Sequence, residues 1–259
     1  MIRIRRRFVI LAIGMVLTVT VVFWAKAQYV VPVIMYHKID ENSAASRLSV
    51  SPESFKRQMN FLKSHKYNVV KLEDLAEMVK KKKFHPKTIA ITFDDGYENN
   101  YLNAYPALKE SGLHATIFIV PALVGAEGYM TWDQIIEMSD SGVISIGSHS
   151  MSHAWLPDLA EQKLDSEITG SKRSIDGHSR KEADIFSYPS GGFNQDTRAK
   201  VIKAGYKIAV RTNPGKKYPK HDLFAMKRLR ISNSSDNLFV FWFETTGFYT
   251  WIKEHRDED

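Results

Sequence analysis

The stretch Ile89-Ala-Ile-Thr-Phe-Asp-Asp-Gly-Tyr97 decides the fold. Its apolar and β-branched residues, beginning at Thr88, predict a buried strand that ends directly on two carboxylates. A second polar cluster, His149-Ser-Met-Ser-His153, follows another apolar run at residues 143–146. Sites in α/β folds lie at the carboxyl ends of the buried parallel strands. Both clusters are therefore expected at the same edge of one sheet.

One carboxylate and two imidazoles form the smallest protein ligand set of a catalytic zinc-type site. Three protein ligands leave one coordination position for water, whose pKa the ion lowers toward neutrality. The other carboxylate of the pair Asp94 and Asp95 is then free to accept the proton of that water. Taken alone, Asp-Asp-Gly is typical of a polar turn, and histidines four residues apart are common on solvated helix faces. Their joint occurrence after two buried strands favours a metal-dependent hydrolase.

With these motifs the sequence resembles the NodB-like polysaccharide deacetylases of carbohydrate esterase family 4. The family's first motif, Thr-Phe-Asp-Asp-Gly, stands intact at Thr92 to Gly96. Its second, His-Ser/Thr-x-x-His, stands at His149 to His153 with the spacing kept. The segment Phe186-Ser-Tyr-Pro-Ser-Gly-Gly-Phe193 is similar to the Tyr-Pro form of the third motif. That segment lacks the arginine that in this family orients the catalytic base.

The resemblance implies a role for each matching residue. Asp94 is expected to be the general base, and the metal ligands are expected to be Asp95, His149 and His153. Zinc is the expected ion, although oxygen and nitrogen ligands also suit cobalt, nickel or manganese. The implied reaction is attack of the metal-bound hydroxide on an acetamide carbonyl, which releases acetate and exposes an amine.

The third motif is expected to supply contacts to the substrate. The backbone N–H of Ser190 would hold the oxyanion of the tetrahedral intermediate together with the metal. Tyr188 and Trp155 are candidates for apolar walls against the acetyl methyl or a sugar face. For each of these two side chains a simple core role is the alternative.

The general acid is the part of the family pattern that matches least. Family members often carry Leu-x-His near the end, whereas this chain has Met226-Lys-Arg-Leu-Arg-Ile231 and no further histidine before His255. His37, in Val33-Ile-Met-Tyr-His-Lys-Ile39, is the candidate substitute, with a substrate-binding or structural role as the alternative. The Met-Tyr-His segment resembles the branch of the family that acts on extracellular poly-N-acetylglucosamine.

Apolar strands alternate with amphipathic helices from Tyr29 onward. Helices are predicted after Ser51, at residues 101–111 and at residues 195–204, the last two ending at glycine. Strands are predicted at residues 30–35, 67–70, 88–93, 115–120, 143–146, 185–188, 208–210 and 229–231. This number of parallel strands fits the distorted (β/α)7 barrel of the resembling family, with a doubly wound open sheet as the alternative α/β fold. One catalytic domain is expected at residues 29–259, with its motif-bearing core at about residues 87–259.

The first 28 residues predict an export signal. Four arginines among the first seven residues precede an apolar stretch at residues 8–24, which Ala25-Lys-Ala-Gln28 follows. The stretch is long for the core of a cleaved signal and near the lower limit for a membrane span. Cleavage after Ala27 and retention as a membrane anchor both stay open. In either case the arginines are expected in the cytosol and the rest of the chain outside.

The net charge of +7 does not indicate a nucleic-acid partner. Residues 1–28 hold five basic and no acidic side chains, which leaves a net charge of +2 for the remainder. The lysines at residues 80–83 are expected to end a helix and face water, with contact to an anionic polymer or membrane as the alternative. The absence of cysteine excludes disulfides and thiolate ligands. A monomer is expected.

The sequence therefore predicts an exported or membrane-anchored deacetylase that removes N-acetyl groups from polysaccharide containing N-acetylglucosamine. An O-acetyl esterase of the xylan type is the second reading, because the same site can attack esters. A carbohydrate-binding relative without turnover is the third, because the family arginine and the late histidine are missing. The intact carboxylate pair and both histidines argue against this third reading, since a pure binder needs neither base nor ligands.

Overall fold

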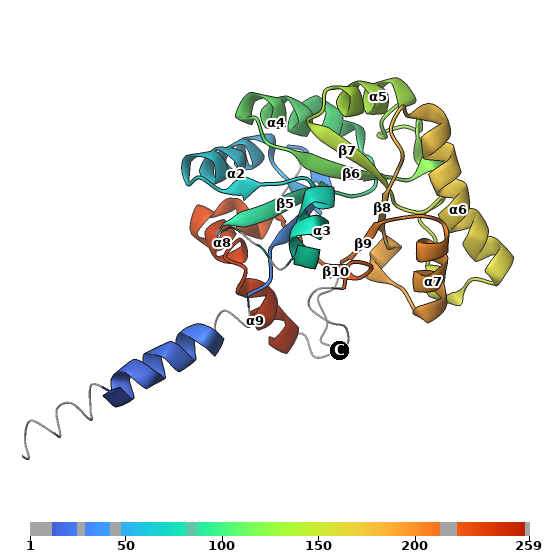
Figure 1. The fold of residues 1–259 in the computed structure, drawn as a ribbon. Coiled ribbons are helices and arrows are strands. Elements are labelled where there is room, and N and C mark those ends of the chain that lie inside the picture. The colour runs from blue at the N-terminus through green and yellow to red at the C-terminus, as the bar shows by residue number, and fades with distance from the viewer. Residues whose placement is uncertain are drawn as a thin grey trace, which may run out of the picture.

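The protein is described by a computed structural model over residues 12–24, 29–41, 48–81, 83, 85, 87–212 and 222–256. Residues 12–24 form a helix that lies outside the main body (Figure 1). Within the described ranges, no helix has both the length and the apolar character needed to cross a membrane. The proposed cleavage site at residues 25–27 and the first part of the apolar stretch lie outside the described residues.

One sheet of parallel strands forms the centre of the molecule, in the order β10-β9-β8-β7-β6-β5-β1-β11. The strands are β1 (Val33–Tyr36), β5 (Thr88–Phe93), β6 (Ala115–Ile119), β7 (Ile144–Ser148), β8 (Ile185–Ser187), β9 (Ile208–Arg211), β10 (Met226–Lys227) and β11 (Leu229–Arg230). A short strand, β4 (Asn68–Val69), also pairs with β5, and β2 (Lys38–Ile39) pairs with β3 (Ser49–Val50) in a separate two-stranded sheet.

The sheet closes on itself at Arg228. This residue alone separates β10 from β11, yet the two strands lie at opposite ends of the strand order. Because β10 pairs with β9 and β11 pairs with β1, the ends of the sheet meet and form a nearly closed barrel. The predicted barrel is thus confirmed, and the open sheet is not adopted.

Each predicted strand overlaps an observed one, with shifts of a few residues at the ends. The largest shift is at β1, which begins at Val33 rather than at residue 30. The Val30 N–H donates to the carbonyl of Gly247, 3.0 Å away, so this residue is tied to a C-terminal turn before the strand begins.

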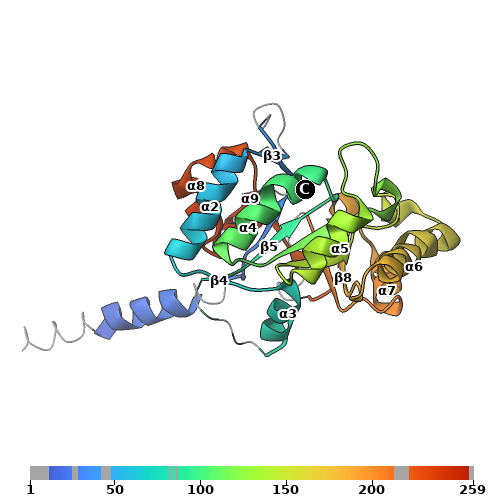
Figure 2. The ribbon, with the colours of Figure 1, turned by 90° about the horizontal axis from the view of Figure 1, so that it is seen from above.

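Helices cover the outside of the barrel. They are α2 (Pro52–Ser64), α3 (Leu72–Lys81), α4 (Tyr105–Ser111), α5 (Trp132–Asp140), α6 (Glu161–His178), α7 (Gln195–Lys203), α8 (Leu238–Glu244) and α9 (Tyr249–Arg256). Figure 1 shows α2, α4 and α5 along one side of the strands and α6 and α7 along another. Figure 2 shows α3 at an end of the barrel, away from α6 and α7.

The helix predicted at residues 101–111 begins as a π-helical turn at Asn100–Ala104 and continues as α4. Pro106 has no N–H with which to form the usual α-helical bond to the preceding turn, and a wider turn accommodates this loss. Gly112 ends the helix in the left-handed conformation, with φ 67°, as the sequence predicts. The predicted cap of α2 is also present, because the Ser51 side chain accepts from the Ser54 N–H at 3.2 Å.

Aromatic side chains fill the space between the strands and α2. The Tyr36 ring stacks on Phe93 with ring centroids 5.3 Å apart, and Phe55 from α2 meets Tyr36 edge-on at 5.2 Å. All three side chains are fully buried. Tyr36 and Phe93 are the last residues of β1 and β5, so this packing fixes the two strand ends from which the carboxylate pair and His37 extend.

Candidate active site

Strand register brings the first motif and the Met-Tyr-His segment together. Tyr36 pairs with Phe93, so His37 and Asp94 are the next residues beyond the same edge of the sheet. The Asp94 N–H donates to the Tyr36 carbonyl at 3.0 Å. The second motif arrives at the same edge because Ser148 pairs with Ile119 of β6 and the His149 N–H donates to the Ile119 carbonyl at 2.8 Å. The predicted meeting of the two clusters is confirmed.

Backbone strain is concentrated in the three motif segments. Among the described residues, six that are not glycine have positive φ, and four of these are Asp95 (73°), Ser150 (62°), His153 (61°) and Ser190 (52°). A residue held in this conformation typically costs about 1 to 3 kcal/mol, and such residues cluster at functional sites. In the motif segments, the backbone therefore adopts a conformation of higher energy that places the side chains at the site.

Asp95, His149 and His153 form a group that fits a metal ion. One ligand atom from each residue lies within 4.8 Å of the others. The Asp95 Oδ1 atom is 3.6 Å from His149 Nε2 and 3.5 Å from His153 Nε2. One carboxylate oxygen and two imidazole nitrogens are donors that zinc and related divalent ions accept.

A hydrogen bond fixes how His149 presents its ring. Its Nδ1 lies 2.8 Å from the Ser187 carbonyl oxygen, which can only accept, so Nδ1 carries the proton. The lone pair of Nε2 then faces the carboxylates, as a metal ligand requires. Burial lowers the pKa of His149 against the opposing effect of Asp94, which favours the neutral ring.

Asp94 is held by a buried arginine. Arg228 Nη1 donates to Asp94 Oδ1 and Nη2 to Oδ2, both at 2.6 Å, and both side chains are almost completely buried. Burial raises the pKa of Asp94, but the charge and the hydrogen bonds of Arg228 outweigh it and hold that pKa well below its usual range. Asp94 is therefore an ionised carboxylate of fixed orientation at neutral pH, as a proton acceptor must be.

Arg228 also donates to Ser187 Oγ at 2.8 Å and to Thr92 Oγ1 at 3.2 Å, and it lies over the Phe118 ring. The expectation that the chain lacks an arginine to orient the base is thus wrong. The third motif contains no arginine. Arg228, which is distant in sequence, lies next to Asp94 because the barrel closes between β10 and β11. Three basic residues among the apolar ones at residues 225–231 are the sequence signal that pointed to this segment.

His37 lies beside the carboxylate pair. Burial lowers its pKa, and the charges of Asp94 and Asp95 oppose this shift. Its Nδ1 is buried with no hydrogen-bond partner among the described residues. A buried ring nitrogen without a partner, next to the predicted base, is compatible with either the catalytic or the substrate-binding role predicted for this residue.

The predicted wall residues differ in their surroundings. Trp155 is 49% exposed, and its indole lies so close to Gly192 that a Cβ there would be 2.1 Å from the ring. Tyr188 is fully buried, stacks on Phe193 and donates to the Phe224 carbonyl at 3.1 Å. This packing favours the core role for Tyr188, and Trp155 is the better candidate for a wall.

Ser190 lies in the short helical turn Pro189–Gly191 that follows β8 and Tyr188. The N–H groups of the next two residues, Gly191 and Gly192, donate to the carbonyls of Tyr188 and Pro189. The serine itself is exposed and left-handed. These features place Ser190 on the surface of the third motif, and its oxyanion role stays a prediction.

Two residues that were not predicted from the sequence lie beside the predicted ligands. Glu167 of α6 is buried and accepts from Ser152 N at 2.9 Å and Ser152 Oγ at 2.6 Å, which ties down the loop between the two histidines. Tyr97 lies next to Asp95, and burial together with that neighbouring charge raises the pKa of Tyr97. Tyr97 therefore stays protonated at neutral pH beside the carboxylate.

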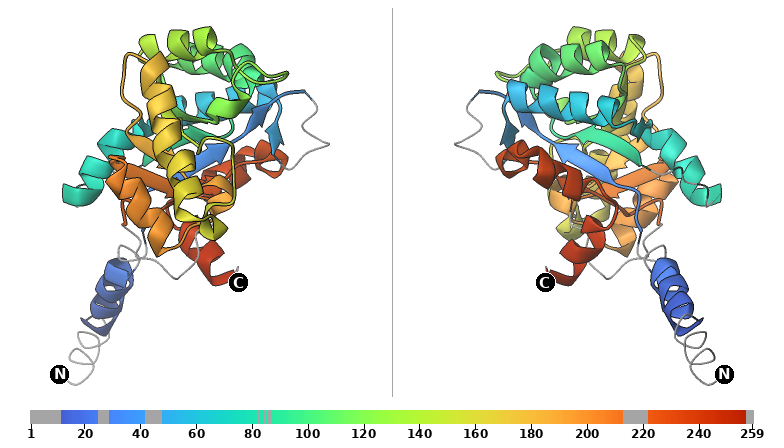
Figure 3. Two further views of the ribbon diagram at one scale, coloured as in Figure 1. Left: turned by 90° about the vertical axis from the view of Figure 1, so that its right-hand side faces the viewer. Right: turned by 90° about the vertical axis from the view of Figure 1, so that its left-hand side faces the viewer.

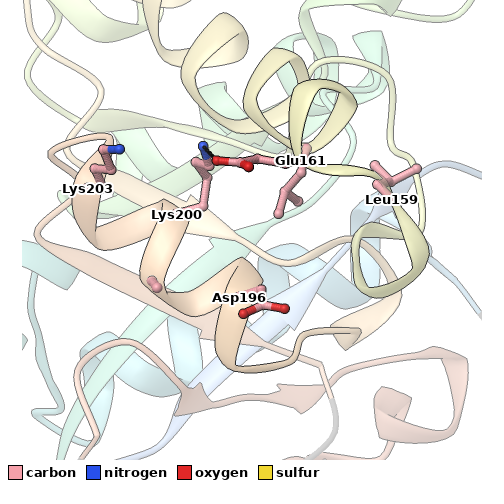
Figure 4. Close-up of a pocket in the computed structure, with 7 residues that line it drawn as sticks. Leu159, Glu161, Asp196, Lys200 and Lys203 are labelled. Carbon is pink, nitrogen blue, oxygen red and sulfur yellow. Dashed lines mark ion pairs between the residues drawn. The ribbon is translucent and has the colours of Figure 1, made fainter.

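A separate pocket of about 460 Å³ lies between α6 and α7 (Figure 4). It is lined by Leu159, Glu161, Leu164, Asp196, Ala199, Lys200 and Lys203. The ammonium of Lys200 lies 3.8 Å from Glu161 and 3.3 Å from Asp165, so its charge is balanced by the protein. None of the predicted site residues lines this pocket.

Known proteins resemble this chain in sequence and in fold. The family model described as polysaccharide deacetylase matches residues 81–209. YxkH of Bacillus subtilis (strain 168), assigned to the polysaccharide deacetylases, is 36% identical over 202 residues, which cover 78% of this chain and 71% of that protein. The crystal structure of BC0361, a polysaccharide deacetylase from Bacillus cereus, superposes with a TM-score of 0.73 at 31% identity, covering 83% of this chain and 68% of the other.

A third relative has a named substrate. The poly-beta-1,6-N-acetyl-D-glucosamine N-deacetylase of Staphylococcus aureus (strain MSSA476) is 28% identical over 208 residues, which cover 75% of this chain and 72% of that protein. With the fold, the motif geometry and these likenesses together, the chain belongs to the polysaccharide deacetylase family and is a hydrolase of that class.

Proposed function

We propose that the protein is a metal-dependent N-deacetylase of polysaccharide that contains N-acetylglucosamine. The observation that carries the proposal is the convergence of Asp95, His149 and His153 beside an ionised Asp94. The likeness to the poly-beta-1,6-N-acetyl-D-glucosamine N-deacetylase of Staphylococcus aureus supports this substrate class. Zinc is the proposed ion, with cobalt, nickel or manganese as alternatives.

Asp95, His149 and His153 would hold the ion, and Asp94 accepts the proton of the attacking water. A bound ion lowers the pKa of its water and polarises the acetyl carbonyl. Arg228 keeps both Asp94 oxygens in place while the carboxylate takes that proton. The water oxygen bonds to the carbonyl carbon, the C–N bond breaks, and acetate leaves as the sugar nitrogen gains a proton. His37, next to the carboxylate pair, is the proposed donor of that proton.

The acetyl group and its sugar need contacts on the side of the third motif. We assign the backbone N–H of Ser190 to the developing oxyanion, because its turn projects at the end of β8. Trp155 offers an exposed indole face two residues beyond His153 and rests on Gly192. This face is suited to pack against a sugar ring that neighbours the reacting unit.

The proposed location is outside the cytoplasmic membrane, either secreted or anchored to its outer face. The basic start and the apolar stretch at residues 8–24 support this placement. A reporter enzyme that works only outside the cytoplasm, fused after Asp259, is expected to be active. Activity of a reporter that works only in the cytoplasm would contradict the placement.

Acetate release from two substrates tests the reaction. Oligomers of N-acetylglucosamine should release acetate, and acetylated xylan should release far less. A preference for xylan would favour the O-acetyl esterase, and release from neither would favour a carbohydrate-binding relative. His149→Ala and His153→Ala should each lose bound metal and activity together, because the remaining two ligands hold an ion weakly.

A further inference from the structure

Helix α8 is apolar on its outer side as well as on the inner side, where Phe241 is fully buried. Its sequence is Leu-Phe-Val-Phe-Trp-Phe-Glu, and its one charged residue, Glu244, is buried. Phe239, Trp242 and Phe243 point outward, with Phe239 70% and Trp242 43% exposed. A surface helix usually directs its apolar residues toward the core and its charges toward water. The outer side of α8 departs from this pattern and is suited to contact an apolar partner.

The exposed aromatic residues continue from α8 to the N-terminal end of the domain. Phe239 contacts Trp242, and Phe243 contacts Tyr249, the first residue of α9. Phe248 is 40% exposed and meets the Tyr29 ring edge-on, with centroids 5.7 Å apart. We call Phe239, Trp242, Phe243 and Phe248 the aromatic surface.

Tyr29 is locked against the aromatic surface. A Cβ on Gly247 would lie 2.3 Å from the Tyr29 ring, so only glycine permits the contact there. The Val30 N–H bond to the Gly247 carbonyl holds the backbone at the same place. The point where the chain joins the domain is therefore fixed at one end of the aromatic surface.

The apolar helix at residues 12–24 precedes Tyr29 by a short link. Five Cα steps separate Trp24 from Tyr29, which together span at most about 18 Å. The described residues of the helix are all exposed and include Val22, Phe23 and Trp24. Figure 3 shows this helix and α9 leaving the barrel on the same side. If the helix enters a bilayer, the aromatic surface lies within reach of that bilayer.

Positive charge borders the aromatic surface. The Tyr67 hydroxyl lies 3.0 Å from Thr245 Oγ1, directly after α8, and the ammonium of Lys87 lies over the Tyr67 ring. Lys66 and Lys87 are both exposed. Aromatic rings beside lysines form the composition that binds the interface of an anionic membrane, where rings enter the headgroup region and cations meet lipid phosphates.

We propose that the aromatic surface docks on the outer leaflet of the cytoplasmic membrane. The proposal rests on retention of the N-terminal apolar segment, which is one of the two fates proposed above. Tyr29 precedes β1 and His37 follows it, so docking near Tyr29 leaves the catalytic edge at the far end of the barrel from the membrane. The active site is then presented to polysaccharide outside the cell.

Cysteine labelling of the full chain tests this surface. The chain contains no cysteine, so one introduced thiol carries the only label. Phe239→Cys and Trp242→Cys are labelled with a polarity-sensitive nitrobenzoxadiazole dye. The chain is then bound to phosphatidylglycerol–phosphatidylcholine vesicles with or without lipid spin-labelled near the headgroup. Leu102→Cys and Ile202→Cys are the matched controls, because Leu102 is 57% and Ile202 42% exposed and both lie outside α8 and α9.

The expected result is a blue shift on vesicles and a loss of emission with spin-labelled lipid at positions 239 and 242, with little change at both controls. Equal quenching at all four positions, or none at 239 and 242 while the chain sediments with vesicles, overturns the docking. A blue shift without lipid that grows with protein concentration also overturns it, in favour of a second copy of the chain.

Failure of the chain to sediment with vesicles removes both membrane retention and the docking. Acetate release by each labelled variant verifies that it is folded. The same assay keeps the deacetylase proposal separate, because it does not depend on lipid.

Discussion

Arg228 and Asp94 form a two-point ion pair that lies at the closure of the barrel. Each guanidinium nitrogen Nη donates to one carboxylate oxygen at 2.6 Å, and neither side chain is reached by solvent. The pair links the residue that separates β10 from β11 to the proposed general base at the end of β5. The closure of the sheet therefore also places the arginine that orients the proposed base.

Arg228→Met should lower both stability and turnover. Loss of one partner leaves Asp94 as an uncompensated buried charge, which typically costs about 3 to 5 kcal/mol. In a domain of this size that corresponds to a fall in Tm of about 6 to 20 °C. Turnover should fall by roughly 10- to 100-fold because the base is no longer oriented. Thermal melting and acetate release measure the two effects.

Arg228→Lys is the informative companion, because it keeps the charge and loses the two-point geometry. It should recover part of the stability and little of the turnover. A lysine variant with full turnover would show that orientation by Arg228 is not needed.

The ion pair also predicts how the difference in stability between the wild type and Arg228→Met depends on pH. Arg228 depresses the folded-state pKa of Asp94, so the pair's contribution is complete above the ordinary carboxyl pKa of about 3.9. That contribution is lost as pH falls through the lower folded-state pKa. In Arg228→Met, burial is the largest remaining effect and raises the pKa of Asp94. Protonation of Asp94 on acidification then removes the buried charge that destabilises the variant.

The gap in Tm between the wild type and Arg228→Met should therefore be smaller at pH 4 than at pH 7. Melting curves at both pH values measure it. Other titrating groups are shared by the two proteins and largely cancel in the comparison. A gap that widens on acidification would contradict the assigned role of the pair.

Local patterns predicted the strands and the motif cluster, and the resemblance to the family favoured the barrel over the open sheet. The apolar runs before Asp94 and His149 are readable as strands, and parallel strands place their carboxyl ends together. Arg228 was not predicted because its partner is 134 residues away and depends on how the sheet closes. Glu167 was not predicted either, because a glutamate is usually solvated and its bonds to Ser152 form only in the folded chain.

Glu167→Gln should weaken metal binding without touching a ligand. The carboxylate accepts from both the N–H and the hydroxyl of Ser152, and an amide oxygen cannot replace both acceptors. The loop that carries His153 should loosen, which lowers metal affinity by about 10- to 100-fold. Competition with a chelator measures the affinity.

Glu161→Gln is the control for Glu167, because it changes an exposed glutamate at the start of the same helix. It should leave metal affinity unchanged. Equal effects in the two variants would show that helix charge, and not the bond to the loop, sets the affinity.

Gly192→Ala should displace Trp155 and weaken the binding of long substrates. The new Cβ would overlap the indole, so the ring has to move. KM for oligomers of N-acetylglucosamine should rise by roughly 10-fold, equivalent to about 1.4 kcal/mol. Hydrolysis of a small aryl acetate should change little, because it does not reach the indole.

Trp155→Ala should reproduce the result of Gly192→Ala. Gly177→Ala in α6 is the matched control, because a Cβ there meets no atom within 4 Å. If oligomer KM is the same in all of these variants, the indole takes no part in substrate binding.

The proposed mechanism requires different roles for Asp94, the base, and Asp95, the metal ligand. Metal content by elemental analysis and acetate release from N-acetylglucosamine oligomers, measured together on Asp94→Asn and Asp95→Asn, test it most directly. Asp94→Asn should keep the metal and lose turnover by roughly 10²- to 10⁴-fold, because an amide cannot accept the proton. Asp95→Asn should lose metal, and excess ion should partly restore its activity. An Asp94→Asn protein without metal beside an Asp95→Asn protein that keeps both ion and activity would contradict the assignment.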